Sequence, residues 1–316
     1  MSIQIEEIRN PKIAIVGLGG VGGYLGGMLG KAYDSVSMVA RRERYDAIKK
    51  NGLVLHSEKN GEITAQPAKL VHSAAELEIQ DFIFLSVKNY SLEDALTELA
   101  PAVDEHTVIV PVMNGVDPGD RVRKGLGKGI VVDALIYIVS FARPDYSIEQ
   151  QGDFADLYVG LKESDETKKQ ALDELDGILT HAGINHKISA DIEADIWKKY
   201  ILNCAYNVAT AYYDNTIGEL RKDPVKTKEY ADLATEAYKV AIAKGVRLEE
   251  KHLNSIIQRF WKYEENAGSS LQRDIHAGRP AEVETFSGYL VKEAAGLGIP
   301  VPVSEKMYLG LLEHTR

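Results

Sequence analysis

The chain has 316 residues, with 37 Lys and Arg against 47 Asp and Glu, so its formal net charge is −10. This length suits about two domains, and 45% hydrophobic residues are ample for packed cores, which excludes a disordered or collagen-like chain. The acidic balance argues against a protein that mainly coats nucleic acid or an anionic membrane, while a local basic patch remains compatible with a phosphorylated small molecule.

The first half alternates short β-branched runs with helical patterns, which is typical of a parallel sheet with helices on both faces. We expect a serine, Ser91, to cap one of these helices. The pattern predicts buried strands at 12–17, 35–39, 82–87 and 107–112, helices at 21–31, 91–99 and 165–182, and strand-like segments at 131–141 and 147–161.

The second half has almost no strand-like texture. Its apolar residues recur with a helical period of 3.6, which predicts helices at 192–213, 226–244, 248–264 and 280–297. The sequence therefore predicts an α/β domain at 1–189, a doubly wound parallel sheet of the Rossmann type, followed by an all-helical domain at 190–316.

A glycine-rich loop, GLGGVGG from Gly17, lies between the first predicted strand and the first predicted helix. In such a GxGxxG loop, Gly17 makes the tight turn, Gly19 lets a pyrophosphate approach the backbone, and Gly22 lets the helix pack on the strand. Glycine-rich turns are common, but here the strand and helix that the motif requires are both present. The loop therefore predicts a dinucleotide site.

The end of the second strand indicates which dinucleotide is bound. A site for NAD usually carries Asp or Glu there, to accept a hydrogen bond from the ribose 2′-hydroxyl. This chain has Arg41, Arg42 and Arg44 instead, and a guanidinium suits a 2′-phosphate. We predict NADP(H) with Arg41 as the main contact; the alternative is a solvated basic helix start.

Two further polar residues follow predicted strands. Lys88 comes after 82–87 and Asn114 after 107–112, and ligands of open α/β sheets bind outside the carboxyl ends of the strands. Both are candidate cofactor or substrate contacts, although Asn114-Gly115 is also an ordinary turn dipeptide.

The predicted helix at 192–213 carries a polar stripe. Lys199, Asn203 and Asn207 stand at i, i+4 and i+8, on one face of the helix. Buried asparagines need partners, so the stripe is either a structural network or the lining of a site whose ionisable member is Lys199. An ammonium beside a ketone oxygen can stabilise its developing negative charge and deliver a proton.

A second polar segment, SSLQRDIHAGRPAEVE, begins at Ser269. Pro280 suits the first position of a helix, which would place Glu282 in the first turn, where the helix dipole favours a carboxylate. Ser270 could likewise be only a helix cap. From spacing alone, structural roles are the simpler interpretation of both.

The remaining composition indicates a cytoplasmic protein without metal. Cys204, the single cysteine, has no partner for a disulfide or a zinc cluster, and the eight histidines match no metal motif. The first eight residues do not resemble a secretory signal, and the most apolar stretch, 130–141, is too short to cross a membrane. We expect a small-molecule substrate and no nucleic-acid or membrane partner; the oligomeric state, a homodimer included, stays open.

Taken together, the motifs resemble the ketopantoate reductases (2-dehydropantoate 2-reductases). The resemblance runs over essentially the whole chain, in the order GLGGVGG, SVKNY at Lys88, MNG at Asn114, WKKYILNCAYN at Lys199 and SSLQRDIHAGRPAEVE at Glu282. The last motif is the most specific, because the Lys-x-x-x-Asn stripe is shared with the wider 6-phosphogluconate-dehydrogenase-like group.

The resemblance implies NADPH-dependent reduction of 2-dehydropantoate to (R)-pantoate, a step of pantothenate and coenzyme A synthesis. It implies that Lys199 donates the proton and that Glu282 closes the site near the nicotinamide ribose and the substrate hydroxyl. Asn114 would contact the nicotinamide end of the cofactor and the substrate. The substrate would be bound also by Asn203, Asn207 and Ser270, and the rest of the cofactor by Gly17, Leu18, Gly19, Gly20, Val21, Gly22, Arg41 and Lys88.

Two departures from the family pattern lie where the identity of the substrate could be set. Ile217 replaces an Asn that some members carry before the Gly-Glu pair, and segment 143–149 lacks a common Pro-Gly turn. The alternatives are a D-2-hydroxyacid dehydrogenase of the same family, some of which use NAD, and a non-catalytic regulator that senses NADP.

Overall fold

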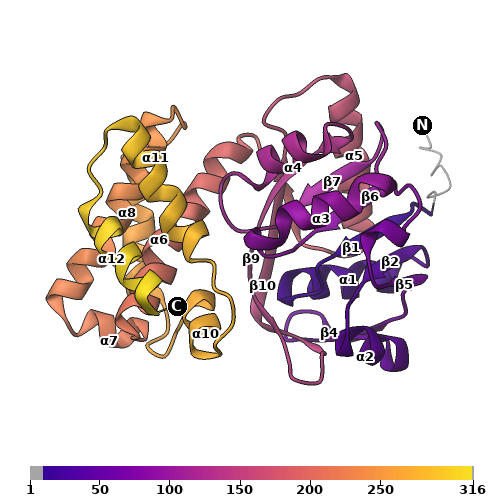
Figure 1. The fold of residues 1–316 in the computed structure, drawn as a ribbon, viewed down its shortest axis with the longest axis horizontal. Helices are drawn as coiled ribbons and strands as arrows, with labels where there is room; N and C mark the ends of the chain where they lie inside the picture. The colour runs from indigo at the N-terminus through magenta and orange to yellow at the C-terminus, as the bar shows by residue number, and fades with distance from the viewer. Residues whose placement is uncertain (1–9, 315–316) are drawn as a thin grey trace, which may run out of the picture. The chain divides into compact units, whose positions relative to one another are not determined.

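The computed structural model describes residues 10–314, which form two compact units (Figure 1). Within the described residues, one unit comprises 10–113 and 117–192, and the other comprises 114–116 and 193–314. The first eight residues, from which we inferred the absence of a secretory signal, lie outside the described range. Within that range, none of the helices has the length and apolar character needed to span a membrane.

The first unit is built on a six-stranded sheet in which every neighbouring pair is parallel. Ile13 and Ile15 of the first strand belong to one buried cluster, and Ala14 and Val16 belong to another, so both faces of the sheet are covered. This confirms the predicted parallel sheet. Its strands, in spatial order, are β5 (Lys69–Val71), β2 (Val36–Val39), β1 (Ile13–Val16), β6 (Phe82–Leu85), β7 (Val108–Pro111) and β8 (Ile130–Val131).

The helices of this unit follow the prediction in three places. One correction concerns Ser91, which precedes α3 but makes no capping hydrogen bond with its side chain, because the 3₁₀ turn η2 (Asn89–Ser91) runs straight into the helix. The predicted helices are α1 (Gly20–Ala32), α3 (Leu92–Leu99) and α5 (Glu166–His181). The structure also has two helices that were not predicted, α2 (Glu43–Asn51) and α4 (Pro118–Leu126). Two further 3₁₀ turns are η1 (Ala74–Glu76) and η3 (Ala100–Ala102).

A second, mixed sheet packs against α1. The strand-like segments predicted at 131–141 and 147–161 are confirmed as two of its strands, whereas their assembly with other strands into a separate sheet was not predicted. Glycines of α1 make the close packing possible: a Cβ at Gly23 would lie 2.4 Å from the Ile148 side chain, and a Cβ at Gly27 would lie 2.9 Å from Leu55. The sheet has the order β11 (His186–Ile188), β10 (Ile148–Gly160), β3 (Leu53–Ser57), β4 (Gly61–Ala65), with β9 (Asp133–Ala142) paired antiparallel to β10.

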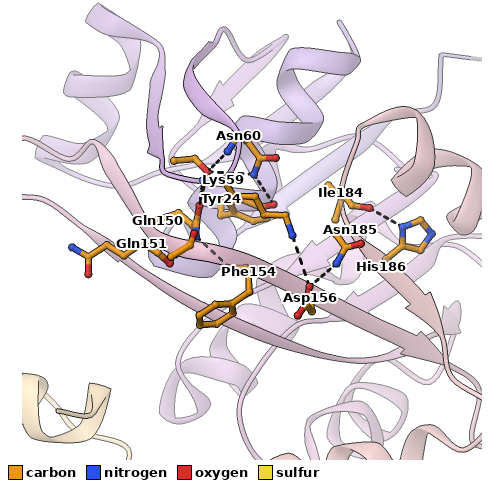
Figure 2. Close-up of polar contacts among 12 residues, drawn as sticks. Tyr24, Lys59, Asn60, Gln150, Gln151, Phe154, Asp156, Ile184, Asn185 and His186 are labelled. Atoms are coloured by element: carbon orange, nitrogen blue, oxygen red, sulfur yellow. Dashed lines mark hydrogen bonds and ion pairs between the residues drawn. The ribbon is translucent and has the colours of Figure 1, made fainter. Parts of the chain in front are cut away.

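Hydrogen bonds and an ion pair connect the β3–β4 turn of this second sheet to α1 and to β10 (Figure 2). Asn60, in the β3–β4 turn, donates to the Tyr24 hydroxyl of α1 at 3.1 Å. Asp156 of β10 accepts from Asn185 and pairs with Lys59, joining the turn to the segment before β11 (Figure 2). His186 lies in β11, with its Nε2 2.8 Å from Asp176 Oδ1.

The second unit is helical, as predicted. The largest helix, α6 (Ile192–Tyr213), matches its predicted range, and its apolar residues Trp197, Tyr200 and Ile201 are buried. The other elements are α7 (Ile217–Arg221), α8 (Pro224–Ala243), α9 (Glu250–Arg259), η4 (Phe260–Lys262), α10 (Ser270–His276), η5 (Glu284–Gly288), α11 (Tyr289–Leu297) and α12 (Pro302–His314).

Candidate functional site

The glycine loop joins β1 to α1 with a backbone that a larger residue would not adopt. Gly17 has a φ of +93°, and a Cβ on it would lie 2.6 Å from the Ser86 carbonyl oxygen of the neighbouring strand end. A Cβ on Gly22 would lie 1.9 Å from the Gly17 carbonyl oxygen. These two glycines therefore let the helix start close against the sheet.

Gly19 differs, because a Cβ there would meet nothing within 4 Å. It caps α1, whose first-turn N–H groups belong to Gly20, Val21 and Gly22, and helix N-termini of this kind bind phosphate through backbone N–H groups. The loop thus leaves open space where a pyrophosphate would approach the helix. This geometry fits a dinucleotide, with Leu18, buried beneath the loop, serving packing.

Lys88 and Arg41 follow the two strands on either side of β1. Lys88 comes after β6 and is the residue before η2, while Arg41 comes after β2. Since β2, β1 and β6 are adjacent and parallel, all three strands end at one edge of the sheet. The predicted cofactor residues of this unit therefore share that edge.

Arg41 is an exposed side chain with an anionic neighbour. Its Nη2 donates to Glu98 Oε1 of α3 at 2.5 Å, and its Nε donates to the His72 carbonyl oxygen at 3.3 Å. Glu98 also accepts from the Ser73 hydroxyl at 2.8 Å. Glu98 could not be recognised from the sequence as a neighbour of Arg41, because 57 residues separate the two in the chain.

The other two arginines of the cluster are held differently. Arg42 is exposed and has φ 55° and ψ −138°, a region that favours glycine. Arg44 lies with its guanidinium carbon 5.5 Å from the centre of the Tyr146 ring, and burial lowers its pKa. Its Nη1 is buried without a hydrogen-bond partner among residues 10–314.

In the helical unit, Lys199 is the ionisable centre of the polar stripe. Its Nζ donates to Asn114 Oδ1 at 3.2 Å, and Asn114 belongs to this unit although it follows β7 in the chain. Burial lowers the pKa of Lys199 to about 8, against the opposing effect of the Glu282 carboxylate. A lysine in this state can give up a proton near neutral pH.

The two asparagines of the stripe form a hydrogen-bonded chain with the start of α10. Asn207 Nδ2 donates to Asn203 Oδ1 at 3.3 Å, while Asn207 Oδ1 accepts from the Ser270 hydroxyl at 3.0 Å and from the Leu271 N–H at 3.3 Å. The stripe therefore includes a structural network at its Asn207 end. Ser270 is the first residue of α10, and the capping role falls to Ser269, which accepts from Gln272 N–H.

Two residues that the sequence analysis missed hold the same segment on α6. The Thr210 hydroxyl donates to the Ser269 hydroxyl at 2.8 Å, and the Tyr206 hydroxyl donates to the Gly268 carbonyl oxygen at 3.2 Å. The one signal in the sequence was their spacing: Tyr206 and Thr210 stand at i and i+4, which places them on the same face of α6.

Glu282 is buried, but it does not lie in the first turn of a helix as predicted. The helical segment begins after it and opens with η5, a π-helical stretch over Glu284–Gly288 that nothing in the sequence pattern predicted. Tyr200 of α6 donates its hydroxyl to the Thr285 carbonyl oxygen at 2.9 Å, which ties η5 to α6. Short π-helical stretches of this kind are frequent at functional sites.

Cys204 stands on α6 beside Asn203 and is only 1% exposed. Burial raises the pKa of its thiol, so it acts as a small apolar residue rather than as a nucleophile.

Two family models match this chain. Residues 13–164 match the family described as ketopantoate reductase PanE/ApbA, and residues 191–312 match the description ketopantoate reductase PanE/ApbA C terminal. Together these two parts span most of the chain and both units.

Individual relatives are similar over nearly their full lengths. An uncharacterised oxidoreductase, YkpB, of Bacillus subtilis is 29% identical, covering 95% of this chain and 97% of the relative. A 2-dehydropantoate 2-reductase of Mesorhizobium japonicum is 28% identical, covering 87% and 89%. The crystal structure of a PanE/ApbA family ketopantoate reductase from Ralstonia eutropha is 26% identical with a TM-score of 0.86, covering 96% of this chain and 98% of that one.

Proposed function

The chain belongs to the ketopantoate reductase (PanE/ApbA) family, and from that premise we propose that it reduces 2-dehydropantoate to (R)-pantoate with NADPH. The observation that carries the proposal is the state of Lys199: a desolvated ammonium, hydrogen-bonded to Asn114, with its pKa brought down to about 8. Reduction of a ketone needs a proton donor of this kind beside the oxygen.

The cofactor, when bound, supplies a hydride. The residues that would hold it are the glycine loop, with the pyrophosphate over Gly19 and the N-terminus of α1, and Lys88 and Arg41 at the same edge of the sheet. Arg41 would take the 2′-phosphate, which is the basis for proposing NADPH rather than NADH. Asn114 and Glu282 would contact the nicotinamide end.

The proton is the contribution of the helical unit. As negative charge develops on the ketone oxygen, the Lys199 ammonium stabilises it and then transfers a proton from Nζ to that oxygen. Its low pKa makes the transfer easier, and the Glu282 carboxylate keeps part of the lysine population protonated.

Asn203 and Ser270 are the residues we propose for the carboxylate and hydroxyl groups of the substrate. Asn207 would act mainly by positioning, because both lone pairs of its amide oxygen are engaged by Ser270 and Leu271. Loss of Asn207 is then expected to disturb Ser270 rather than to remove one contact.

The substrate is tested with a panel of 2-ketoacids, each assayed with NADPH and with NADH. We expect 2-dehydropantoate with NADPH to have the highest kcat/KM. A clear preference for phenylpyruvate or benzoylformate with NADH would instead favour a D-2-hydroxyacid dehydrogenase of the same family. The departures from the family pattern at Ile217 and in segment 143–149 are the reason for testing this alternative.

The catalytic role is tested with Lys199→Met, which keeps an unbranched side chain in this half-buried position. Turnover should fall about 10²-fold or more, in line with the loss of a general acid, while NADPH binding and the melting temperature change little. Unchanged turnover would reject Lys199 as the donor. No turnover with any ketoacid in the unaltered protein, together with tight NADPH binding, would favour the regulator.

A further inference from the structure

The Arg41 side chain is already paired before any ligand is considered. Two of its five N–H donors are used, one by Glu98 Oε1 at 2.5 Å and one by the His72 carbonyl oxygen at 3.3 Å. The ion pair is accessible, since 61% of the Arg41 side chain and 30% of the Glu98 side chain are exposed. A ligand at the end of β2 therefore meets both charges.

Glu98 is a fixed anion at neutral pH. Its burial works to raise the pKa, but hydrogen bonds from Ser73 and Arg41 and the positive charge of Arg41 outweigh that effect and lower the pKa below its usual range. The Ser73 hydroxyl, at 2.8 Å, holds the other carboxylate oxygen and fixes the orientation of the group.

We propose that Glu98 is a specificity-determining residue of the cofactor site, and that it competes with the 2′-phosphate of NADPH for Arg41. This inference rests on the proposed function in one respect, that a nicotinamide dinucleotide binds at this edge of the sheet. A 2′-phosphate draws the guanidinium away from Glu98 and approaches the carboxylate, so part of the gain from Arg41 is lost to repulsion.

An unphosphorylated ribose meets the same pair differently. Its hydroxyl groups are donors, and a carboxylate is the group that NAD sites use to accept from the 2′-hydroxyl. Glu98 belongs to α3 rather than to the end of β2, and it is held beside the arginine that would take the phosphate. The Arg41–Glu98 pair thus brings the affinities for NADPH and NADH closer together than three neighbouring arginines alone would.

The test is the ratio of dissociation constants for NADPH and NADH, measured on the full chain by nucleotide fluorescence without any ketoacid. Glu98→Gln keeps an oxygen for Ser73 and removes the charge. It should lower the dissociation constant for NADPH about three- to tenfold and leave that for NADH unchanged or higher. A larger change is not expected, because an exposed ion pair contributes little free energy of its own. In an Arg41→Ala background the competition for the guanidinium is absent, so the tightening that the same change still causes there measures only the direct repulsion between the Glu98 carboxylate and the phosphate.

Glu78→Gln is the matched control. Glu78 pairs with Lys12 Nζ at 2.7 Å, next to the amino end of β1 and so at the opposite edge of the sheet, and its loss changes the net charge equally. An equal tightening of NADPH in this control would overturn the inference, as would an unchanged ratio in Glu98→Gln. If Glu98→Gln does not fold, Glu98→Asp, which withdraws the carboxylate by one methylene, should shift the ratio in the same direction.

The outcomes separate this inference from the proposed function. If the unaltered protein binds neither nucleotide, the proposed function fails and this inference fails with it. If it binds both and the ratio does not respond to Glu98, only this inference is overturned. Since no ketoacid is used, a wrong substrate assignment leaves the test intact.

Discussion

Lys199 is the residue whose protonation should control the rate of the proposed reaction. In the reductive direction the donor must carry its proton, and burial has brought its pKa down to about 8. The plot of kcat/KM against pH should therefore be level below about pH 8 and fall about tenfold per pH unit above it. Steady-state assays between pH 6 and pH 10 measure this directly.

Lys199→Arg provides the comparison for that profile. A guanidinium keeps its proton throughout this range, so the variant should be slower but lack the alkaline decline. A decline of the same midpoint in Lys199→Arg would show that another group causes it.

Arg42 has a backbone conformation that should be strained. Its φ of 55° with ψ −138° favours glycine, and strain of this kind costs about 1–3 kcal/mol in other residues. We expect Arg42→Gly to be more stable than Arg42→Ala by about 1 kcal/mol in urea unfolding, after the greater flexibility of glycine in the unfolded chain is allowed for. Both variants remove the same charge, so the difference isolates the backbone. Equal stabilities would contradict the strain.

At the scale of elements, α1 has two separate uses for its glycines. Those of the loop shape the start of the helix, while those further along the helix, such as Gly23 and Gly27, allow the second sheet to approach. The predicted position of the loop between a strand and a helix is confirmed, whereas no role was predicted for the later glycines. Their recurrence at three- and four-residue intervals was the available sign of a close partner, because small residues on one helix face permit near contact.

The loop glycines should separate folding from cofactor binding. Gly22→Ala places a methyl group against the Gly17 carbonyl oxygen, at 1.9 Å before any relaxation, and should lower the free energy of unfolding by about 2 kcal/mol or more. Gly19→Ala meets no protein atom within 4 Å and has an ordinary φ of −75°, so stability should change little.

The expected result for nucleotide binding follows from the same open space. The methyl group of Gly19→Ala would stand where the pyrophosphate is proposed to approach, and NADPH should bind at least about tenfold more weakly at nearly unchanged melting temperature. Retained NADPH affinity in a stable Gly19→Ala protein would contradict the proposed position of the pyrophosphate.

At the scale of the whole molecule, the sequence predicted the parallel sheet and the helical second half because each depends on local periodicity. The range of α6 was predicted to the residue, since a long amphipathic pattern has few alternative registers. The single helix predicted at 280–297 was wrong at its start, where the structure has an irregular segment followed by the π-helical stretch η5, and neither is visible in the periodicity of the sequence. Two strands of the mixed sheet, at 131–141 and 147–161, were predicted, but their pairing with β3 was not, because β3 and β10 are far apart in the chain.

The candidate site shows the same division. The stripe of Lys199, Asn203 and Asn207 could be read from helical spacing, and so could the glycine loop. Glu98 and Thr210 could not, because their partners, Arg41 and Ser269, are separated from them by more than fifty residues. Long-range pairs of side chains are fixed by tertiary packing, which a single sequence does not display.

The burial of Cys204 has a practical consequence. The chain has a single thiol, and that thiol is enclosed in α6. A thiol reagent in solution can modify it only in molecules whose α6 has opened, so the labelling rate reports that opening without an introduced probe. Because each modified molecule gains one adduct, mass spectrometry gives the labelled fraction directly. The measurement can be made with or without nucleotide in every variant named above, since all of them keep this cysteine.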